Sequence, residues 1–200
     1  MSEPSLILAS SSPRRKEILE AMGVTFTIQT TAVDESPRVG ERAADMVLRL
    51  AAAKATAIPA GPGQIVIGAD TAVVLGEESF GKPMDAGDAL RMLTRLAGQT
   101  HQVMTGVALA TPDGLESALS VTDVRFREIN PDEARRYWQS GEPQGKAGAY
   151  AIQGRGGVFV EAIMGSYTGV VGLPVYETAR LLRAAGLDVL PVLMDHQSGA

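Results

Sequence analysis

The amino-acid sequence predicts an α/β fold in which a mixed central β-sheet is flanked by helices. Segments with the two-residue alternation of strands recur between segments whose apolar residues are spaced as in helices. Two strand patterns also follow each other across a short turn signal, which indicates a hairpin and therefore antiparallel pairing. The 200 residues suit one domain with a sizeable core.

The first 28 residues predict a strand, a helix and a second strand. Residues 5–9 (SLILA) form a compact apolar run that is typical of a buried strand. Ser12 suits the N-cap of the following helix, Pro13 suits its first position, and Gly23 ends it. Apolar and polar residues then alternate over residues 24–28, which predicts the second strand.

The next elements are a helix over residues 42–58 and two strands over 65–67 and 72–75. An apolar stripe predicts the helix, and the sequence PAGPG at 59–63 ends it. Residues 68–71 (GADT) lie between the two strands.

Residues 76–83 predict a turn region before a further helix. Asp85 and Asp88 resemble a capping pair at the start of that helix, and Gly98 lies just past its end.

Two strands, over about 101–110 and 117–127, flank the turn signal PDG at 112–114. The next helix is predicted to start at Asn130, because a proline and then Glu133 follow it as in a capping box.

The C-terminal part begins with a glycine-rich, polar stretch over residues 141–157, which is long for an idle connection. A strand over 158–163 and a helix over 174–185 follow, and residues 195–200 are expected to form a frayed tail.

Composition excludes several classes of protein. The chain has no cysteine, which excludes a disulfide framework, an iron–sulfur cluster and a cysteine nucleophile. The net charge of -5 argues against a non-specific nucleic-acid binder, which would normally be basic. No apolar stretch approaches the ~20 residues that a membrane span needs. We therefore expect neither nucleic acid nor a membrane as partner, and a cytoplasmic location.

Residues 10–15 (SSSPRR) are the first candidate for chemistry, because a strand ends and a helix begins there. A helix N-terminus offers free N–H groups and partial positive charge to an anion. Arg14 and Arg15 run against the preference of a first helical turn for acidic residues. The segment is either a solvated helix start with a serine cap or a phosphate site. The arginines favour phosphate, which guanidinium groups bind in a bidentate manner.

Asp70 is the second candidate, since it interrupts an otherwise apolar pattern. A buried carboxylate is costly unless it is paired or binds metal, so Asp70 is a metal ligand or a general base, or else a turn aspartate. Asp34 and Glu35 form an acidic pair that alone would indicate a solvated loop. Carboxylates that converge on a cation touching phosphate oxygens are, however, typical of a Mg²⁺ site.

Three further residues could contact a nucleotide. Lys54, in an alanine-rich helix, and Lys82, in the sequence GKP, are either solvated surface lysines or charges that neutralise a triphosphate. Gln153 lies in residues 146–157 (KAGAYAIQGRGG), which form either a flexible loop or a segment that passes close to a ligand. Its amide could read a base edge with one donor and one acceptor.

Taken together, these segments resemble the Maf family of nucleotide pyrophosphatases. The matching stretches occur in the family's order and extend over nearly the whole chain. They are residues 8–15 (LASSSPRR), 68–71 (GADT), 81–83 (GKP), 96–101 (LAGQTH), 165–167 (GSY) and 170–174 (VVGLP).

The resemblance implies a single domain over residues 1–200, with two lobes and a cleft, similar to the inosine triphosphate pyrophosphatases. Family members cleave nucleoside triphosphates between the α and β phosphates with a divalent cation, Mg²⁺ or Mn²⁺. By position, Asp70 matches the proton acceptor, and Glu35 and Asp70 match metal-site positions. The positions that match phosphate and substrate contacts are Ser10, Arg14, Arg15, Lys54 and Lys82, and those linked to substrate choice are Arg14, Thr71 and Gln153. A homodimer is implied by the resemblance alone.

Residues 146–150 (KAGAY) and 152–154 (IQG) resemble the subgroup that acts on dTTP and UTP. The expected activity is therefore hydrolysis of pyrimidine nucleoside triphosphates to the monophosphate and pyrophosphate, with modified pyrimidine nucleotides as further substrates. Two alternatives stay open: the same chemistry on 7-methyl-GTP, and a nucleotide-binding regulator of septum formation in cell division.

Overall fold

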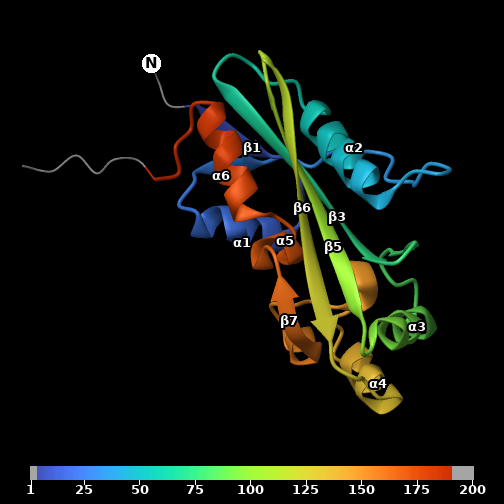
Figure 1. Ribbon diagram of the computed structural model, residues 1–200. Coiled ribbons are helices and arrows are strands. Elements are labelled where there is room, and N and C mark those ends of the chain that lie inside the picture. Colours follow the sequence, from blue (N-terminus) through green and yellow to red (C-terminus); the bar gives the residue numbers. More distant parts are fainter. Residues whose placement is uncertain (1–3, 191–200) are drawn as a thin grey trace, which may run out of the picture.

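The computed structural model describes residues 4–190, and within them seven strands form one mixed sheet (Figure 1). The strand order is β2-β1-β3-β5-β6-β7, and β4 pairs with β3 beside this path. β1 lies parallel to β2 and β3, whereas the other neighbouring pairs are antiparallel. This mixed sheet confirms the predicted fold class.

The chain begins with β1 (Ser5–Leu8), α1 (Pro13–Ala21), β2 (Phe26–Ile28) and α2 (Ala43–Thr56), in the predicted order. The predicted serine cap of α1 is wrong in one respect. Ser12 stands at the N-cap, but its side chain makes no capping hydrogen bond. Its backbone N–H instead donates to Ser10 Oγ at 3.2 Å. The serine whose side chain accepts a backbone N–H before the helix is therefore Ser10 and not Ser12.

β3 (Gln64–Leu75) is a single continuous strand, and the prediction of two separate strands is wrong. Residues 68–71 pair in register with β5, with Gly68 opposite Ala108 and Thr71 opposite Thr105. Glycine and aspartate have low strand propensity, but tertiary pairing overrides such preferences. Asp70 is therefore a strand residue, which rules out its interpretation as a turn aspartate.

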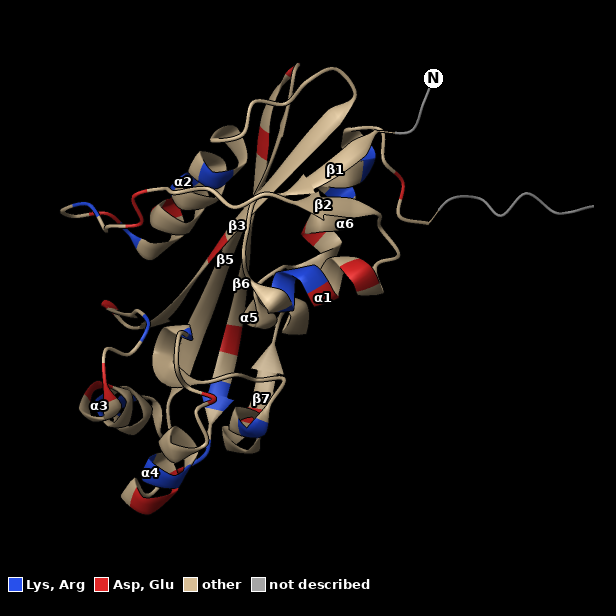
Figure 2. Ribbon diagram, turned by 180° about the vertical axis from the view of Figure 1, so that it is seen from behind, with Lys and Arg blue, Asp and Glu red and all other residues tan. Residues whose placement is uncertain are grey.

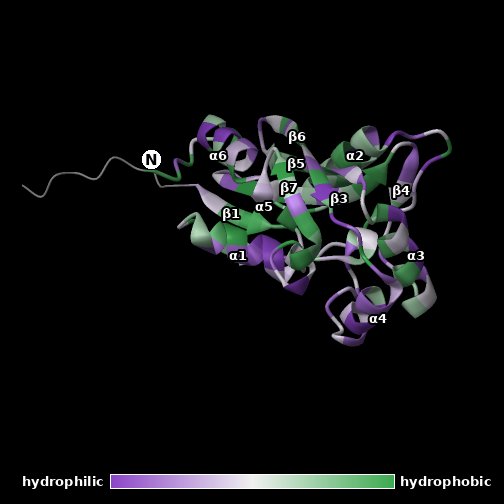
Figure 3. Cartoon of the chain, turned by 60° about the horizontal axis from the view of Figure 1, so that its bottom comes forward, coloured by the Kyte–Doolittle hydropathy of each residue, from purple (hydrophilic) through white to green (hydrophobic). Residues whose placement is uncertain are grey.

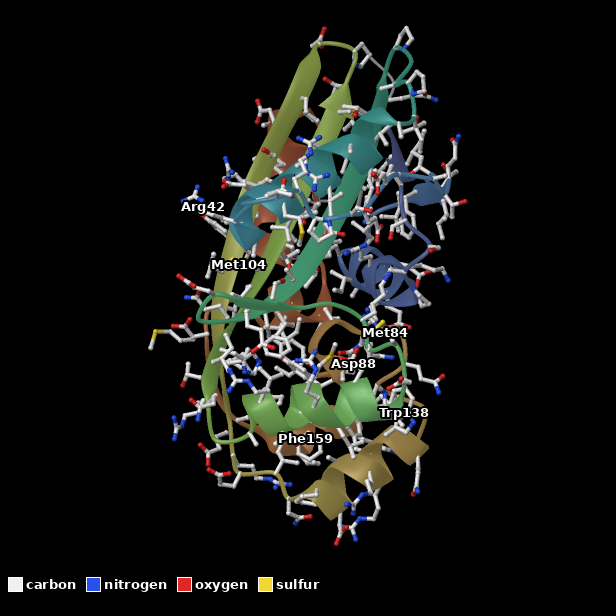
Figure 4. All side chains as sticks on the ribbon, turned by 90° about the vertical axis from the view of Figure 1, so that its right-hand side faces the viewer. Arg42, Met84, Asp88, Met104, Trp138 and Phe159 are labelled. Atoms are coloured by element: carbon white, nitrogen blue, oxygen red, sulfur yellow. The ribbon has the colours of Figure 1, made fainter. Side chains whose placement is uncertain are left out.

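The region predicted as a turn before the third helix contains a short strand, β4 (Glu78–Phe80), antiparallel to the end of β3. α3 (Ala86–Leu96) starts as predicted at Asp85, whose Oδ1 accepts the N–H of Asp88 at 2.8 Å. The Asp88 carboxylate accepts the N–H of Met84 at 3.1 Å, and Figure 4 labels both residues at this end of α3.

β5 (Thr100–Thr111) and β6 (Gly114–Phe126) form the predicted hairpin, and both are longer than the sequence pattern indicates. α4 (Pro131–Gln139) begins with the predicted capping box. The Asn130 side chain accepts the N–H of Glu133 at 2.9 Å, and the Glu133 carboxylate accepts the N–H of Asn130 at 3.2 Å.

The glycine-rich stretch contains two 3₁₀ turns, η1 (Ala147–Ala149) and η2 (Arg155–Phe159), and leads into β7 (Val160–Met164). A short helix that the sequence analysis missed, α5 (Tyr167–Val171), precedes α6 (Val175–Ala184). The predicted tail at 195–200 lies outside the described residues. Among the described helices, none is both long and apolar enough to cross a membrane.

Separate apolar cores stabilise the two ends of the sheet. At one end, α2 packs on one sheet face, and α1 and α6 pack on the other (Figure 1). The strands between these layers are largely hydrophobic (Figure 3). At the other end, α3, α4 and β7 enclose a second core that includes Phe126, Tyr137 and Phe159, the last of which is labelled in Figure 4.

Candidate active site

A cleft of about 620 Å³ opens beside β3, between the two cores. β1 pairs with β3 as far as Ile67, and β4 pairs with it from Val73 onward. Within residues 4–190, no strand pairs with the β3 edge between these two points, so side chains from other elements can gather there. The cleft brings together all nine site residues predicted from the sequence: Ser10, Arg14, Arg15, Glu35, Lys54, Asp70, Thr71, Lys82 and Gln153.

The buried Lys54 connects the two acidic residues of the site. Its residue exposure is 8%, and it projects from α2, which packs across β3. The Nζ atom lies 2.7 Å from Asp70 Oδ1 and 2.6 Å from Glu35 Oε1. A buried lysine requires such partners, because an uncompensated ammonium in a low-dielectric interior is very costly. The interpretation of Lys54 as a solvated surface lysine is therefore wrong.

Two glycines permit this contact, and the sequence analysis assigned them no such role. A Cβ atom at Gly68 would lie 2.6 Å from the Ala55 N atom, and one at Gly106 would lie 2.5 Å from the Val47 carbonyl oxygen. α2 can thus lie against β3 and β5 at a distance that no larger residue would allow. Glycine inside a strand is a known sign of such close approach, and it is the signal that could have predicted this packing.

The two carboxylates differ in exposure. The Asp70 side chain is 13% exposed, whereas that of Glu35 is 48% exposed and also lies 3.9 Å from Lys82 Nζ. The hydrogen bond from Lys54 is the main cause that lowers the pKa of Glu35 below its usual value. Asp34, considered with Glu35 as an acidic pair, does not line the cleft, and it accepts the Ser36 N–H at 2.9 Å.

The start of α1 supplies positive charge to the cleft (Figure 2). Arg15 Nε donates to the Gly172 carbonyl oxygen at 2.9 Å, and its Nη1 donates to Ser10 Oγ at 3.1 Å. Burial lowers the pKa of Arg15, and the charge of Asp70 opposes that shift. Arg14 forms no ion pair with any carboxylate of the described residues, so its guanidinium group is available to an anionic ligand.

Thr71 and Gln153 reach the cleft from other directions. Thr71 points to the sheet face opposite Asp70, and its Oγ1 lies 3.0 Å from Thr105 Oγ1. Thr105, which the sequence analysis missed, donates to the Gly169 carbonyl oxygen at 2.8 Å and so ties α5 to the sheet. Gln153 is exposed at the cleft. Lys146 also lines the cleft, although its position in the glycine-rich segment had suggested no individual role.

Glu35 and Asp70 together could hold a divalent cation. Carboxylate oxygens are the donors that Mg²⁺ prefers, and Mg²⁺ commonly takes one or two of them together with water and phosphate oxygens. Glu35 and Asp70 approach the same ammonium group within hydrogen-bonding distance, so their oxygens converge. Over residues 4–190 no group of three acidic or histidine side chains could hold an ion. The donor set fits a cation that also binds substrate oxygens.

The chain matches the family of Maf-like proteins over residues 5–185. It is 49% identical over 188 residues to the dTTP/UTP pyrophosphatase of Hahella chejuensis, an alignment that covers 92% of this chain and 94% of that one. It is 50% identical over 190 residues to the dTTP/UTP pyrophosphatase of Methylococcus capsulatus, with 94% of each chain covered. Among solved structures, the Staphylococcus aureus Ham1 protein aligns with a TM-score of 0.45 at 12% identity, over 61% of this chain and 71% of that one. On the family match and these relatives, the chain belongs to the Maf family.

Proposed function

We propose that this protein hydrolyses dTTP and UTP between the α and β phosphates, releasing the nucleoside monophosphate and pyrophosphate. The observation that carries the proposal is the Glu35–Lys54–Asp70 contact within a cleft that Arg14 and Lys82 also line. A carboxylate pair beside several cations suits a triphosphate with its counterion. The names of the relatives from Hahella chejuensis and Methylococcus capsulatus support the choice of pyrimidine substrates.

Asp70 is the proposed proton acceptor. Its carboxylate lines the cleft, and Lys54 restricts its orientation through the 2.7 Å hydrogen bond. One oxygen faces the ammonium, and the carboxylate as a whole can accept further hydrogen bonds. A water that attacks the α phosphorus gives its proton to this carboxylate, while the bond to the bridging oxygen breaks and pyrophosphate leaves.

Glu35 and Asp70 are the proposed ligands of Mg²⁺ or Mn²⁺. A bound cation would supply positive charge to the phosphate oxygens and so stabilise the charge that develops on them. Glu35 suits this role because it lines the cleft and its side chain is half-exposed, so its oxygens are accessible to a bound cation.

The basic residues are the proposed contacts of the leaving group. Arg14, in α1, and Lys82, in the loop after β4, line the cleft from different elements and can approach different phosphate oxygens. Arg15 is already engaged by Gly172 and Ser10, so it offers a guanidinium group held in a defined orientation. Preorganised positive charge at the departing pyrophosphate lowers the barrier because the charge develops where the donors already point.

A substrate panel tests the proposal. Purified enzyme with Mg²⁺ is offered dTTP, UTP, CTP, GTP and 7-methyl-GTP, and both pyrophosphate and monophosphate are measured. The proposal expects dTTP and UTP to be the fastest substrates, with equal amounts of the two products. Faster turnover of 7-methyl-GTP would overturn the substrate assignment, and release of single phosphates would overturn the site of cleavage.

Asp70→Asn tests the catalytic assignment. Loss of a general base typically costs roughly 10²- to 10⁴-fold in rate, and we expect a loss in this range with an unchanged circular dichroism spectrum. Asp113→Asn, in the exposed turn of the β5–β6 hairpin, is the matched control and should retain full activity. Turnover by Asp70→Asn at the wild-type rate would exclude Asp70 as the proton acceptor.

We further propose that the two core regions are the lobes of one domain, and that the protein acts as a cytoplasmic homodimer. The two separate apolar cores on either side of the cleft support the division into lobes. Sedimentation velocity at micromolar concentration tests the dimer, which a monomeric mass would exclude.

A further inference from the structure

Glu142 lies outside the residues assigned above and makes three hydrogen bonds around the segment that carries Gln153. Its Oε2 accepts the backbone N–H of Arg155 at 2.9 Å. Its Oε1 accepts the N–H of Gly156 at 2.9 Å and the hydroxyl of Tyr137 at 2.7 Å. Burial opposes ionisation of this carboxylate, but the three donors outweigh it and lower its pKa. Glu142 is therefore an ionised acceptor at neutral pH.

Tyr137 connects the same carboxylate to the other side of Gln153. Its hydroxyl oxygen accepts the N–H of Ala151 at 3.0 Å while the hydroxyl donates to Glu142. Tyr137 is 6% exposed, and its ring packs edge-on against the Phe159 ring, with 5.1 Å between the ring centroids, within the core that contains α3 and α4. The backbone N–H groups of residues 155 and 156 are thereby bound directly to the Glu142 carboxylate, and that of residue 151 is bound to it through the Tyr137 hydroxyl, which lies in the buried core.

Two glycines leave room for this close contact. A Cβ atom at Gly154 would lie 2.6 Å from the Glu142 carboxyl carbon, and one at Gly156 would lie 2.5 Å from the Tyr137 hydroxyl oxygen. Neither position has the positive φ that would by itself explain a glycine. Both glycines therefore allow the backbone to approach Glu142 and Tyr137 closely.

The Gln153 side chain is the part of this turn that stays free. It is exposed, lines the cleft and makes no hydrogen bond within the described residues, whereas the backbone on both sides is held. A turn fixed at both ends with one free amide at its centre is suited to presenting that amide to a ligand, because little backbone entropy is then lost on binding.

We propose that Glu142, with Tyr137, is a positioning residue that fixes the orientation of Gln153 toward the base of the nucleotide. The proposal rests on the proposed function, since it assumes a pyrimidine nucleotide in the cleft. At position 4 uracil carries a carbonyl oxygen that accepts a hydrogen bond, whereas cytosine carries an amino group that donates one. A backbone held on both sides of Gln153 restricts the positions from which its amide can reach this edge of the base, whereas a mobile backbone would let the amide adapt to both patterns.

Glu142→Gln tests this role with little change in size. The new amide nitrogen cannot accept the Arg155 N–H, so one end of the turn is released. We expect KM for UTP to rise roughly tenfold, the size typical of a lost charge-assisted hydrogen bond, with little change in kcat. The preference for UTP over CTP should fall, and the amides of Arg155 and Gly156 should exchange hydrogen faster.

Tyr137→Phe is the second variant, since it keeps the buried ring and removes only the hydroxyl. It should shift KM and the UTP preference in the same direction. Glu161→Gln, which removes an exposed carboxylate on β7 that pairs with Arg125 on the neighbouring strand β6, is the control and should change neither KM nor the UTP preference.

The outcomes separate the two proposals. If the wild type turns over no pyrimidine triphosphate, the proposed function fails, while amide exchange still reports whether Glu142 holds the turn. If the wild type is active but both variants keep its KM and its UTP preference, the positioning role is wrong. A loss of kcat at unchanged KM, matched by a lower melting temperature, would also overturn it, because that pattern indicates a stability role only.

Discussion

Substitution of Gly68 by alanine adds one methyl group between β3 and α2, and it tests whether the close packing of these elements sets the Lys54–Asp70 contact. Gly68 lies on β3 directly under α2, two residues before Asp70 and on the same face of the strand. The added Cβ atom would meet the helix backbone at the Ala51 oxygen and at the Ala55 nitrogen, the latter at 2.6 Å. Because both contacts are backbone atoms, no side-chain rotation can relieve them.

The size of the effect follows from that contact. Ordinary van der Waals contact begins at 3.4 Å, so α2 must move by at least about 0.8 Å locally. Overpacking of this kind costs typically 1–3 kcal/mol, and each kcal/mol lowers the melting temperature by roughly 2–4 °C in a chain of this length. Lys54 moves with the helix, and misplacement of a positioning group by ~1 Å can cost on the order of 10²-fold in activity.

The assay combines thermal unfolding with steady-state pyrophosphate release. Gly87→Ala is the matched control, because Gly87 lies in α3 away from the cleft and its nearest contact is an Asp85 carboxylate oxygen at 3.3 Å. Alanine is the better helix former, so this control should be as stable as the wild type or slightly more stable. Wild-type melting and wild-type kcat/KM in Gly68→Ala would refute the idea that close packing of α2 sets the Lys54–Asp70 contact.

Two other features lead to predictions of their own. Arg49 binds both Glu41 oxygens, at 2.6 and 2.7 Å, and also the Ser36 carbonyl oxygen at 3.2 Å, so it anchors the loop that carries Glu35. Arg49→Ala should therefore raise the Mg²⁺ concentration needed for half-maximal rate several-fold. Arg42→Ala is the control and should leave this concentration unchanged, because its partner Asp45 is exposed. Equal Mg²⁺ dependence of the two variants would contradict the prediction. Burial lowers the pKa of His101 from 6.5 to about 4, so the unfolded chain binds the proton first and the free energy of unfolding should fall as the pH drops from about 6.5 to 4. The ring resonances of His101 should not titrate above about pH 5, and a titration near pH 6.5 in the folded protein would show that the ring is accessible to water.

Much of the fold follows from local patterns. The hairpin turn at residues 112–114 and the capping box from Asn130 to Glu133 are specified by neighbouring residues, and both occur as predicted. β3 is different, because Gly68 and Asp70 have low strand propensity when judged by their neighbours alone. Only pairing with β5 on one side and packing of α2 above explain why the strand continues through them.

In the candidate site, too, some features follow from the sequence and others only from tertiary contacts. Residue type and position, together with the resemblance to a family, selected Asp70, Glu35 and Lys54 as separate candidates. Their mutual contact could not be read from the sequence, since Glu35 lies in a loop, Lys54 in a helix and Asp70 in a strand. Glu142 was missed for a related reason: two of its three donors are backbone N–H groups, which leave no trace in residue type apart from the glycines that make room for it.

The sequence alone determined the order of most of the helices and strands, the exclusion of cysteine chemistry and, with the family resemblance, a set of candidate site residues, because these depend on residue type and short-range spacing. The tertiary structure decided which of those residues meet. It placed one buried ammonium between two carboxylates and held the turn at Gln153 by a single carboxylate. Those contacts join residues far apart in the chain, and they depend on how closely a backbone can approach a helix or a buried side chain. Here that distance is set by glycines at 68, 106, 154 and 156.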